Sequence, residues 1–170
     1  MEVVVSITEN PHIVGLVRKM VAFANQSPRL EFVSQQLMRL MARVAMLRAG
    51  TKSAANLKGI FEQWQRSSPA LAEYRLTEIK GETAYAEIHS QCALRGSGDV
   101  AACHRMMEYD REVMRVVGGE LVVLESQATP GRTFCTVAMR TAGATMTDFT
   151  PAHRRLPLLS SARGGDRVPR

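Results

Sequence analysis

The chain has 170 residues, of which 45% are apolar, so it is long enough and apolar enough to fold around a core of its own. Its net charge of +6 is concentrated at one end, because residues 152–170 supply +4 of it, and the nearly neutral remainder argues against nucleic-acid binding. No apolar stretch approaches the roughly 18 residues of a membrane span, the start lacks a secretory signal, and three cysteines cannot all pair, so we expect a cytoplasmic domain.

The first half of the chain is predicted to be helical. Asn10-Pro11 and Ser27-Pro28 each place a capping residue before a proline, which starts one helix at residues 11–25 and a second after residue 28. A third helix is expected at residues 54–66. The second helix carries apolar residues at helical spacing, which define one face and a candidate surface for a homodimer. These residues are Leu30, Val33, Leu37, Leu40, Met41, Val44 and Leu47.

The second half changes to a strand-rich pattern, a β-β-α-β-β unit. The predicted elements cover residues 73–80, 83–92, 99–117, 120–127 and 132–140. Helices ahead of such a unit predict an α+β fold, with N-terminal helices packed on an antiparallel sheet. We expect residues 1–141 to form a single ligand-binding domain and residues 142–170 to form a basic, disordered tail.

The helix predicted at residues 99–117 carries the main candidate site. Asp110 falls in the middle of its apolar stripe, where a carboxylate is costly unless it is paired, protonated or bound to a ligand. Cys103 lies two turns earlier, roughly 10 Å along the axis, so the two side chains suit two walls of one pocket. Met107, Asp110 and Met114 are therefore candidate pocket residues. An ordinary core in which Asp110 meets an arginine or a backbone amide is the alternative.

The same half contains residues of the types that bind zinc. Cys103, Glu125 and Cys135 could converge if the helix packs on the last hairpin, with His104 or Cys92 as a fourth ligand. No Cys-x-x-Cys pair is present, and three buried thiols of an ordinary core account for the same cysteines.

Four features between residues 83 and 140 match a known pattern. They are His89-Ser90-Gln91-Cys92 closing a strand, Cys103 at the start of a helix, Glu125 late in a strand, and Gly131-Arg132-Thr133-Phe134-Cys135 entering the last one. This arrangement resembles the 4-vinyl reductase, or hydrocarbon-binding, domain family over about a third of the chain. The resemblance implies an apolar ligand pocket beside a structural zinc held by a glutamate and three cysteines. The middle cysteine of that pattern is missing here, where Ala128 or Gln127 stands.

The same stretch is similar to the aminothiazoline-carboxylate hydrolases, through Cys92, Cys103, Asp110 and Cys135. That resemblance implies an enzyme. In this hypothesis Cys103 or Cys92 is the nucleophile and Asp110 the acid or base, and the start of a helix favours a thiolate at Cys103.

Three functions therefore stay open. The first is a sensory or binding domain for a small apolar or aromatic molecule, the second a cysteine-dependent hydrolase, and the third a dimerising interaction subunit. Zinc is the one cofactor for which the sequence carries candidate ligands, and the residues are compatible with both binding and catalysis.

Overall fold

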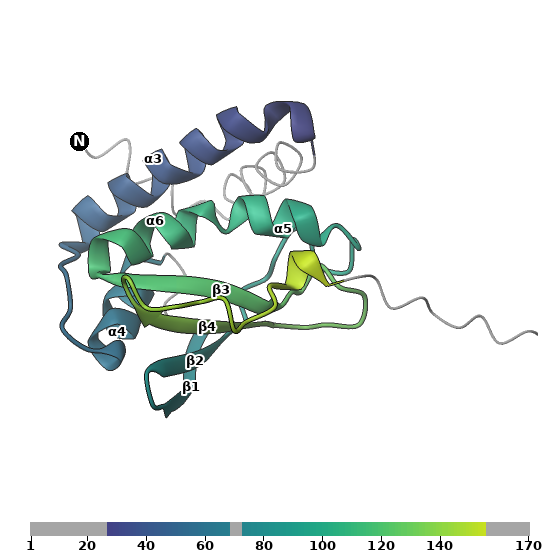
Figure 1. The fold of residues 1–170 in the computed structure, drawn as a ribbon. Helices are drawn as coiled ribbons and strands as arrows, with labels where there is room; N and C mark the ends of the chain where they lie inside the picture. Colours follow the sequence, from purple (N-terminus) through teal and green to yellow (C-terminus); the bar gives the residue numbers. More distant parts are fainter. Residues whose placement is uncertain (1–26, 69–72, 156–170) are drawn as a thin grey trace, which may run out of the picture.

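The computed structural model describes residues 27–68 and 73–155 of the chain. Within them the fold is α+β, as predicted, with helices packed against a four-stranded antiparallel sheet (Figure 1). The predicted helix at residues 11–25 and the end of the predicted tail, residues 156–170, lie outside the described residues. None of the described helices is long and apolar enough to cross a membrane.

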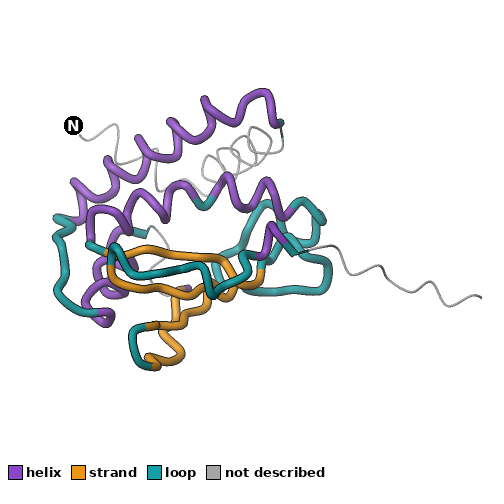
Figure 2. The backbone as a smooth tube through the Cα atoms, in the orientation of Figure 1, coloured by secondary structure: helices purple, strands orange, loops and turns teal. Residues whose placement is uncertain are grey.

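The sheet has the strand order β1-β2-β4-β3, so the two predicted hairpins meet through β2 and β4 (Figure 2). All four strands form where they were predicted. The differences of more than one residue are that β2 and β3 end earlier than predicted and that β4 starts later. The strands are β1 (Tyr74–Lys80), β2 (Thr83–Ile88), β3 (Gly119–Glu125) and β4 (Cys135–Thr141). Because β2 ends at Ile88, residues 89–92 form a loop that is free to line a cavity.

Two helices replace the single one predicted at residues 99–117. They are α5 (Val100–Met106) and α6 (Glu108–Val117), separated by Met107. Asp99 caps α5, since its carboxylate accepts a hydrogen bond from the backbone amide of Ala102 at 2.7 Å. α6 ends at Gly118, whose φ of 88° is a left-handed conformation that favours glycine.

The core lies between one face of the sheet and the helices α4 (Leu57–Ser67) and α6. Asn56 caps α4 by accepting from the amide of Gly59 at 2.9 Å. Gly119 begins β3 where α4 comes close, because a Cβ at this position would lie 2.9 Å from Ile60. The most deeply buried large side chains include Trp64, Ile60, Met114, Val113 and Val137.

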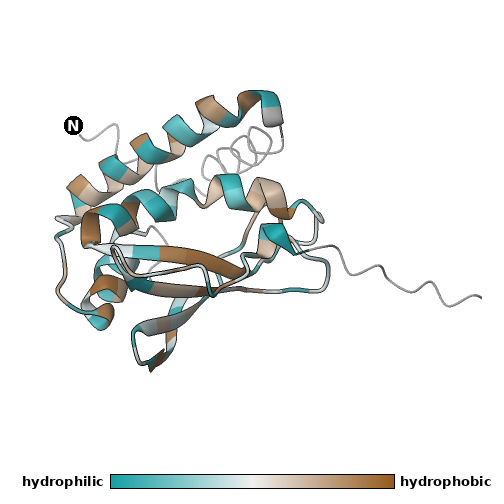
Figure 3. Cartoon of the chain, viewed as in Figure 1, coloured by the Kyte–Doolittle hydropathy of each residue, from teal (hydrophilic) through white to brown (hydrophobic). Residues whose placement is uncertain are grey.

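The helix α3 (Glu31–Ala49) lies along α6 and turns its apolar face outward (Figures 1 and 3). The side chains that it buries are Ser34, Met38, Ala42 and Met46. The predicted apolar face lies on the opposite side, where Val33, Leu40 and Leu47 are 62%, 59% and 83% exposed. Beside its buried methionines and alanine, α3 is joined to α6 by Arg39 and Arg43, which bind carboxylates of α6 at 2.8 Å each.

The described part of the predicted tail packs against the domain. Arg140 of β4 forms a bidentate pair with Asp148, and its guanidinium lies 4.5 Å from the ring centre of Phe149. The 3₁₀ turn η3 (Ala152–Arg154) then contacts α5. Residues 142–155 thus form part of the folded unit.

A candidate ligand cavity with a buried acid and a thiol pair

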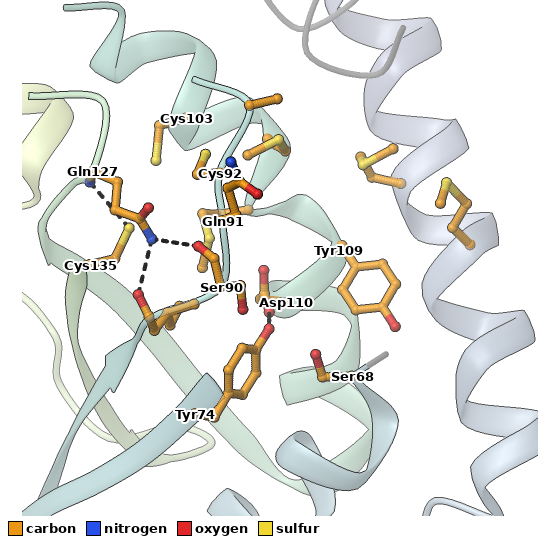
Figure 4. A pocket seen from close by; sticks show the side chains of 16 residues that line it. Ser68, Tyr74, Ser90, Gln91, Cys92, Cys103, Tyr109, Asp110, Gln127 and Cys135 are labelled. Atoms are coloured by element: carbon orange, nitrogen blue, oxygen red, sulfur yellow. Dashed lines mark hydrogen bonds between the residues drawn. The ribbon is translucent and has the colours of Figure 1, made fainter. Parts of the chain in front are cut away.

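A cavity of about 250 Å³ lies between α3, the α5–α6 pair and the ends of β1, β2 and β4. Its walls are mainly apolar and include four methionines, Met38, Met41, Met106 and Met107. Unbranched thioether side chains adapt their shape to a bound molecule more easily than branched ones. Among the polar side chains, Asp110 lies near Tyr74, and Gln127 lies near Cys135 in another part of the lining (Figure 4). Such a lining is typical of small-molecule sites.

Asp110 reaches the cavity from the first turn of α6 and is 7% exposed. Its Oδ1 accepts hydrogen bonds from Trp64 Nε1 at 2.9 Å and from the Tyr74 hydroxyl at 3.4 Å. Both donors are neutral, so they support the carboxylate without cancelling its charge. Burial raises the pKa of Asp110 to about 6, against these hydrogen bonds and the positive charge of Arg111. At neutral pH the cavity therefore presents a buried, mostly ionised carboxylate.

The positive charge of Arg111 and the backbone amide of Asp110 itself also lower the pKa of this carboxyl, so both kinds of partner predicted for an ordinary core act on it. The sequence did not indicate its two side-chain hydrogen-bond partners, Trp64 and Tyr74. A signal was present, because Trp64 falls on the apolar face of α4 and a buried indole N–H needs an acceptor. For Tyr74 the sequence contained no such signal, because its contact with Asp110 depends on how β1 packs.

The other part of the lining holds Cys103 of α5 and Cys135, the first residue of β4. Both side chains line the cavity (Figure 4). Interaction with the Cys103 thiol and the hydrogen bond from the amide of Gln127, 3.3 Å from Cys135 Sγ, lower the pKa of Cys135 although burial opposes them. Interaction with Cys135, together with burial, raises the pKa of Cys103. The arrangement thus favours the thiolate on Cys135. The sequence had predicted it on Cys103, because that residue lies at the start of a helix.

Gln127 organises this part of the cavity, and only 1% of it is exposed. Its side-chain amide donates to the carbonyl oxygens of Ile88 and Ser90 at 3.0 Å each and accepts from Arg95 at 2.9 Å. These bonds fix the loop that follows β2 against the start of β4. Gln127 is also one of the two residues predicted to stand where the resembled family pattern has a cysteine, and its side chain is engaged in the hydrogen bonds above.

The predicted zinc ligands do not form a metal-binding group. Within residues 27–68 and 73–155, no three histidine, cysteine, aspartate or glutamate side chains are arranged to hold a metal ion. Cys103 and Cys135 come together, but the Glu125 carboxylate is bound by Arg132 at 2.6 Å. His104 stacks on His153, with ring centres 3.7 Å apart. The donor set therefore does not fit zinc.

The other predicted site residues divide between cavity and core. Met107 and Cys92 line the cavity with Asp110 and Cys103. Met114 is buried in the core and is not among the described residues that line the cavity. Met38, which the sequence did not indicate, and Met41, which was predicted to lie on the dimer face, enter from α3 and line the cavity on the helical side.

Comparison with family models, curated proteins and solved structures finds no match to the chain. The two family resemblances therefore stay predictions, and the function has to be argued from the cavity itself.

Proposed function

We propose that the domain binds a small apolar or aromatic molecule that carries a hydrogen-bond donor, such as an amine. The observation that carries the proposal is a buried carboxylate, Asp110, on the wall of a cavity whose remaining lining is mostly thioether, thiol and aromatic. Burying a charge costs free energy unless the charge is paired and hydrogen-bonded, and buried ionisable groups gather at functional sites. A ligand cation or donor that reaches Asp110 would complete its partners, while the methionines would contact an apolar body.

The size of the cavity supports a compact ligand. An apolar cavity of about 150 Å³ holds a benzene molecule, so one of about 250 Å³ suits one substituted ring or two small fused rings. Long-chain lipids would not fit within this volume.

Binding fits the contacts better than hydrolysis does. Asp110 accepts hydrogen bonds from Trp64 and Tyr74, whereas Cys135 Sγ accepts one from the amide of Gln127, so the acid and the thiol do not form a bonded pair. Nucleophilic catalysis by cysteine relies on a base or acid in contact with the thiol. We therefore place the hydrolase hypothesis second. The cytoplasm remains the proposed location, and no zinc is assigned.

The proposal is tested by thermal unfolding with paired probes, benzylamine against toluene and an aminomethyl-naphthalene against naphthalene. A ligand at one hundred times its Kd adds about 2.7 kcal/mol of stability, so the amine of each pair should raise the Tm clearly and the hydrocarbon less. Ser90→Leu, which adds bulk to the cavity wall, should reduce the shift. Ser53→Leu, at an exposed position outside the lining, is the matched control. Equal shifts for both variants, or none in the unmodified protein with either amine, would contradict binding in this cavity.

A second proposal concerns α3: we propose that two copies of the chain associate through its outward face. Five apolar residues follow one another at spacings of four and three, which is the seam of a two-stranded coiled coil. They are Val33, Leu37, Leu40, Val44 and Leu47, each at least 40% exposed. Antiparallel pairing of two such seams crosses at Leu40.

Light scattering after size exclusion tests this proposal. The unmodified chain should have the mass of a dimer at micromolar concentration, and Leu40→Glu should convert it to a monomer because it places a charge at the centre of the seam. Ile79→Glu, at an exposed apolar residue of β1, should remain dimeric. A monomer at all concentrations would contradict the proposal and make the chain's own residues 11–25 the alternative cover for this face.

A further inference from the structure

The 3₁₀ turn η3 meets the helix α5 through a pair of histidines. The turn is the yellow element beside α5 in Figure 1. The ring of His153 in η3 stacks on the ring of His104 in α5, with ring centres 3.7 Å apart and planes 29° from parallel. Ala152, next to His153, packs against the core. The contact that places η3 on α5 is thus a stack of two titratable rings.

The hydrogen bonds around His104 show that its ring is neutral in the stack. Arg111 Nη1 lies 3.5 Å from His104 Nδ1, and a guanidinium only donates, so Nδ1 is the acceptor and carries no proton. Arg111 is fixed there, because its Nη2 donates to the His104 carbonyl oxygen at 2.7 Å and its Nε donates to Glu108 at 2.8 Å. A proton on Nδ1 would remove this acceptor and place a second cation beside the guanidinium.

The charged groups of α6 and η3 around the stack are mainly cationic. Burial, the guanidinium of Arg111, His153 and Arg154 together lower the pKa of His104 to about 4. Burial, Arg154 and Arg111 also lower the pKa of His153. Glu108 opposes these effects at His104, but three arginines share this carboxylate. At neutral pH both rings are therefore uncharged, and they repel each other once both are protonated.

The strand β3 also contacts η3, and its carboxylates are bound at other positions. Glu120 accepts from the backbone amide of Gly143 at 3.1 Å, and Glu125 pairs with Arg132 at 2.6 Å. On α5 itself, the residue after His104 is Arg105, a further cation. A proton added to either histidine therefore adds positive charge mainly beside other positive charges.

We propose that the His104–His153 stack is a pH-sensitive clasp, which holds residues 151–155 on α5 while both rings are neutral and releases them in acid. Because the docked state favours the neutral rings, docking is fully stable above about pH 6.5, the ordinary pKa of histidine, and weakens as the pH falls toward 4. The pair between Asp148 and Arg140 stays closed over this range, because the pKa of Asp148 lies below its ordinary value. Release therefore affects residues 151–155 and leaves the chain before them attached.

NMR on the isotope-labelled full-length chain tests the clasp. The two rings should show a nuclear Overhauser effect to each other at about pH 7.5, and this effect should weaken at about pH 4.5. The amides of Arg154 and Arg155, which donate to the carbonyl oxygens of Pro151 and Ala152 in the docked turn, report release through solvent exchange. Corrected for the intrinsic rate at each pH, their protection should fall by at least about tenfold, since one pKa unit corresponds to a tenfold change.

Two variants separate the clasp from other effects of acid. The double variant His104→Phe, His153→Phe keeps two rings that can stack but cannot be protonated, so its protection should be the same at both pH values. His89→Phe is the matched control. His89 is also stacked, on Phe134 at 4.9 Å, but its Nε2 lies 2.7 Å from a carboxylate oxygen of Glu87. This control should lose protection in acid as the unmodified chain does.

Equal protection of the two amides at both pH values in the unmodified chain would overturn the proposal. Equal losses in the unmodified chain and the double variant would also overturn it, since the pH sensitivity would then lie outside the pair. If the double variant does not dock at about pH 7.5, the ring-to-ring effect of the unmodified chain decides, and it must weaken in acid. No ligand is added, so this result is independent of binding in the cavity. Protonation of Asp110 stabilises the fold over the same range and cannot cause the release.

Discussion

At the scale of single residues, the proposed function depends most on Asp110. It is buried, accepts from two neutral donors and faces a cavity, so its charge has no opposite charge bonded to it among the described side chains. The sequence was sufficient to find this residue, because its position within an apolar helical stripe conflicts with its charge. The same logic did not single out Gln127, since an uncharged amide in a loop gives no pattern.

The first prediction concerns the pH dependence of stability. Because the pKa of Asp110 is raised to about 6, the folded chain binds this proton more tightly than the unfolded chain, and stability falls as the pH rises from about 4 through 6. Asp110→Asn keeps an oxygen for the Trp64 donor and removes the buried charge. The free energy of unfolding above pH 6 should rise by on the order of 1–3 kcal/mol, given about 1.4 kcal/mol per pKa unit.

Urea unfolding of both proteins at several values between pH 4 and pH 8 measures this difference. Asp148→Asn is the control, because the pKa of this exposed, Arg140-bound carboxylate is lowered and its loss should not add stability. A gap between wild type and Asp110→Asn that does not widen from pH 4 to pH 6 would show that Asp110 is not strained by burial.

At the scale of elements, α3 combines a narrow buried apolar face with ionic contacts to α6. Glu108 of α6 binds Arg39 of α3, and also Arg111 and Arg115, each at 2.8 Å. Burial alone would raise the pKa of Glu108, but hydrogen bonds from the three guanidinium groups outweigh it and hold the pKa at about 2. The sequence predicted the helix correctly. It did not show which face packs inward, because the inward face carries serine, alanine and arginine beside its methionines.

A second prediction follows for this contact. Glu108→Gln should lower the free energy of unfolding at pH 7 by about 1–3 kcal/mol, since it leaves three arginines, two of them partly buried, without their common carboxylate. The depressed pKa means that this contribution is present above about pH 4.5 and is lost as the pH falls through 2. Glu62→Gln, which removes an exposed pair with Lys58 at 3.9 Å, should change stability by less than about 0.5 kcal/mol. Similar losses for both variants would contradict a specific role for Glu108.

Across the whole molecule, the features set by local sequence patterns could be predicted, whereas those set by tertiary contacts could not. Period and capping predicted the α+β order and the antiparallel hairpins, because these depend on neighbouring residues. The join between β2 and β4 and the convergence of Cys103 with Cys135 depend on contacts far apart in the chain. The interruption at Met107 was also missed, since its neighbours continue the helical pattern on both sides.

The central claim is that a small molecule binds in the cavity beside Asp110, and the chain contains a direct reporter for it. Its single tryptophan, Trp64, donates to Asp110 Oδ1 at 2.9 Å. The most direct measurement is therefore a titration with the amine that raises the Tm most, followed by Trp64 fluorescence at pH 7.5. We predict a saturable change in emission, with a Kd at least about tenfold weaker in Asp110→Asn, which corresponds to about 1.4 kcal/mol. No saturable change, or the same Kd in both proteins, would contradict ligand binding at Asp110.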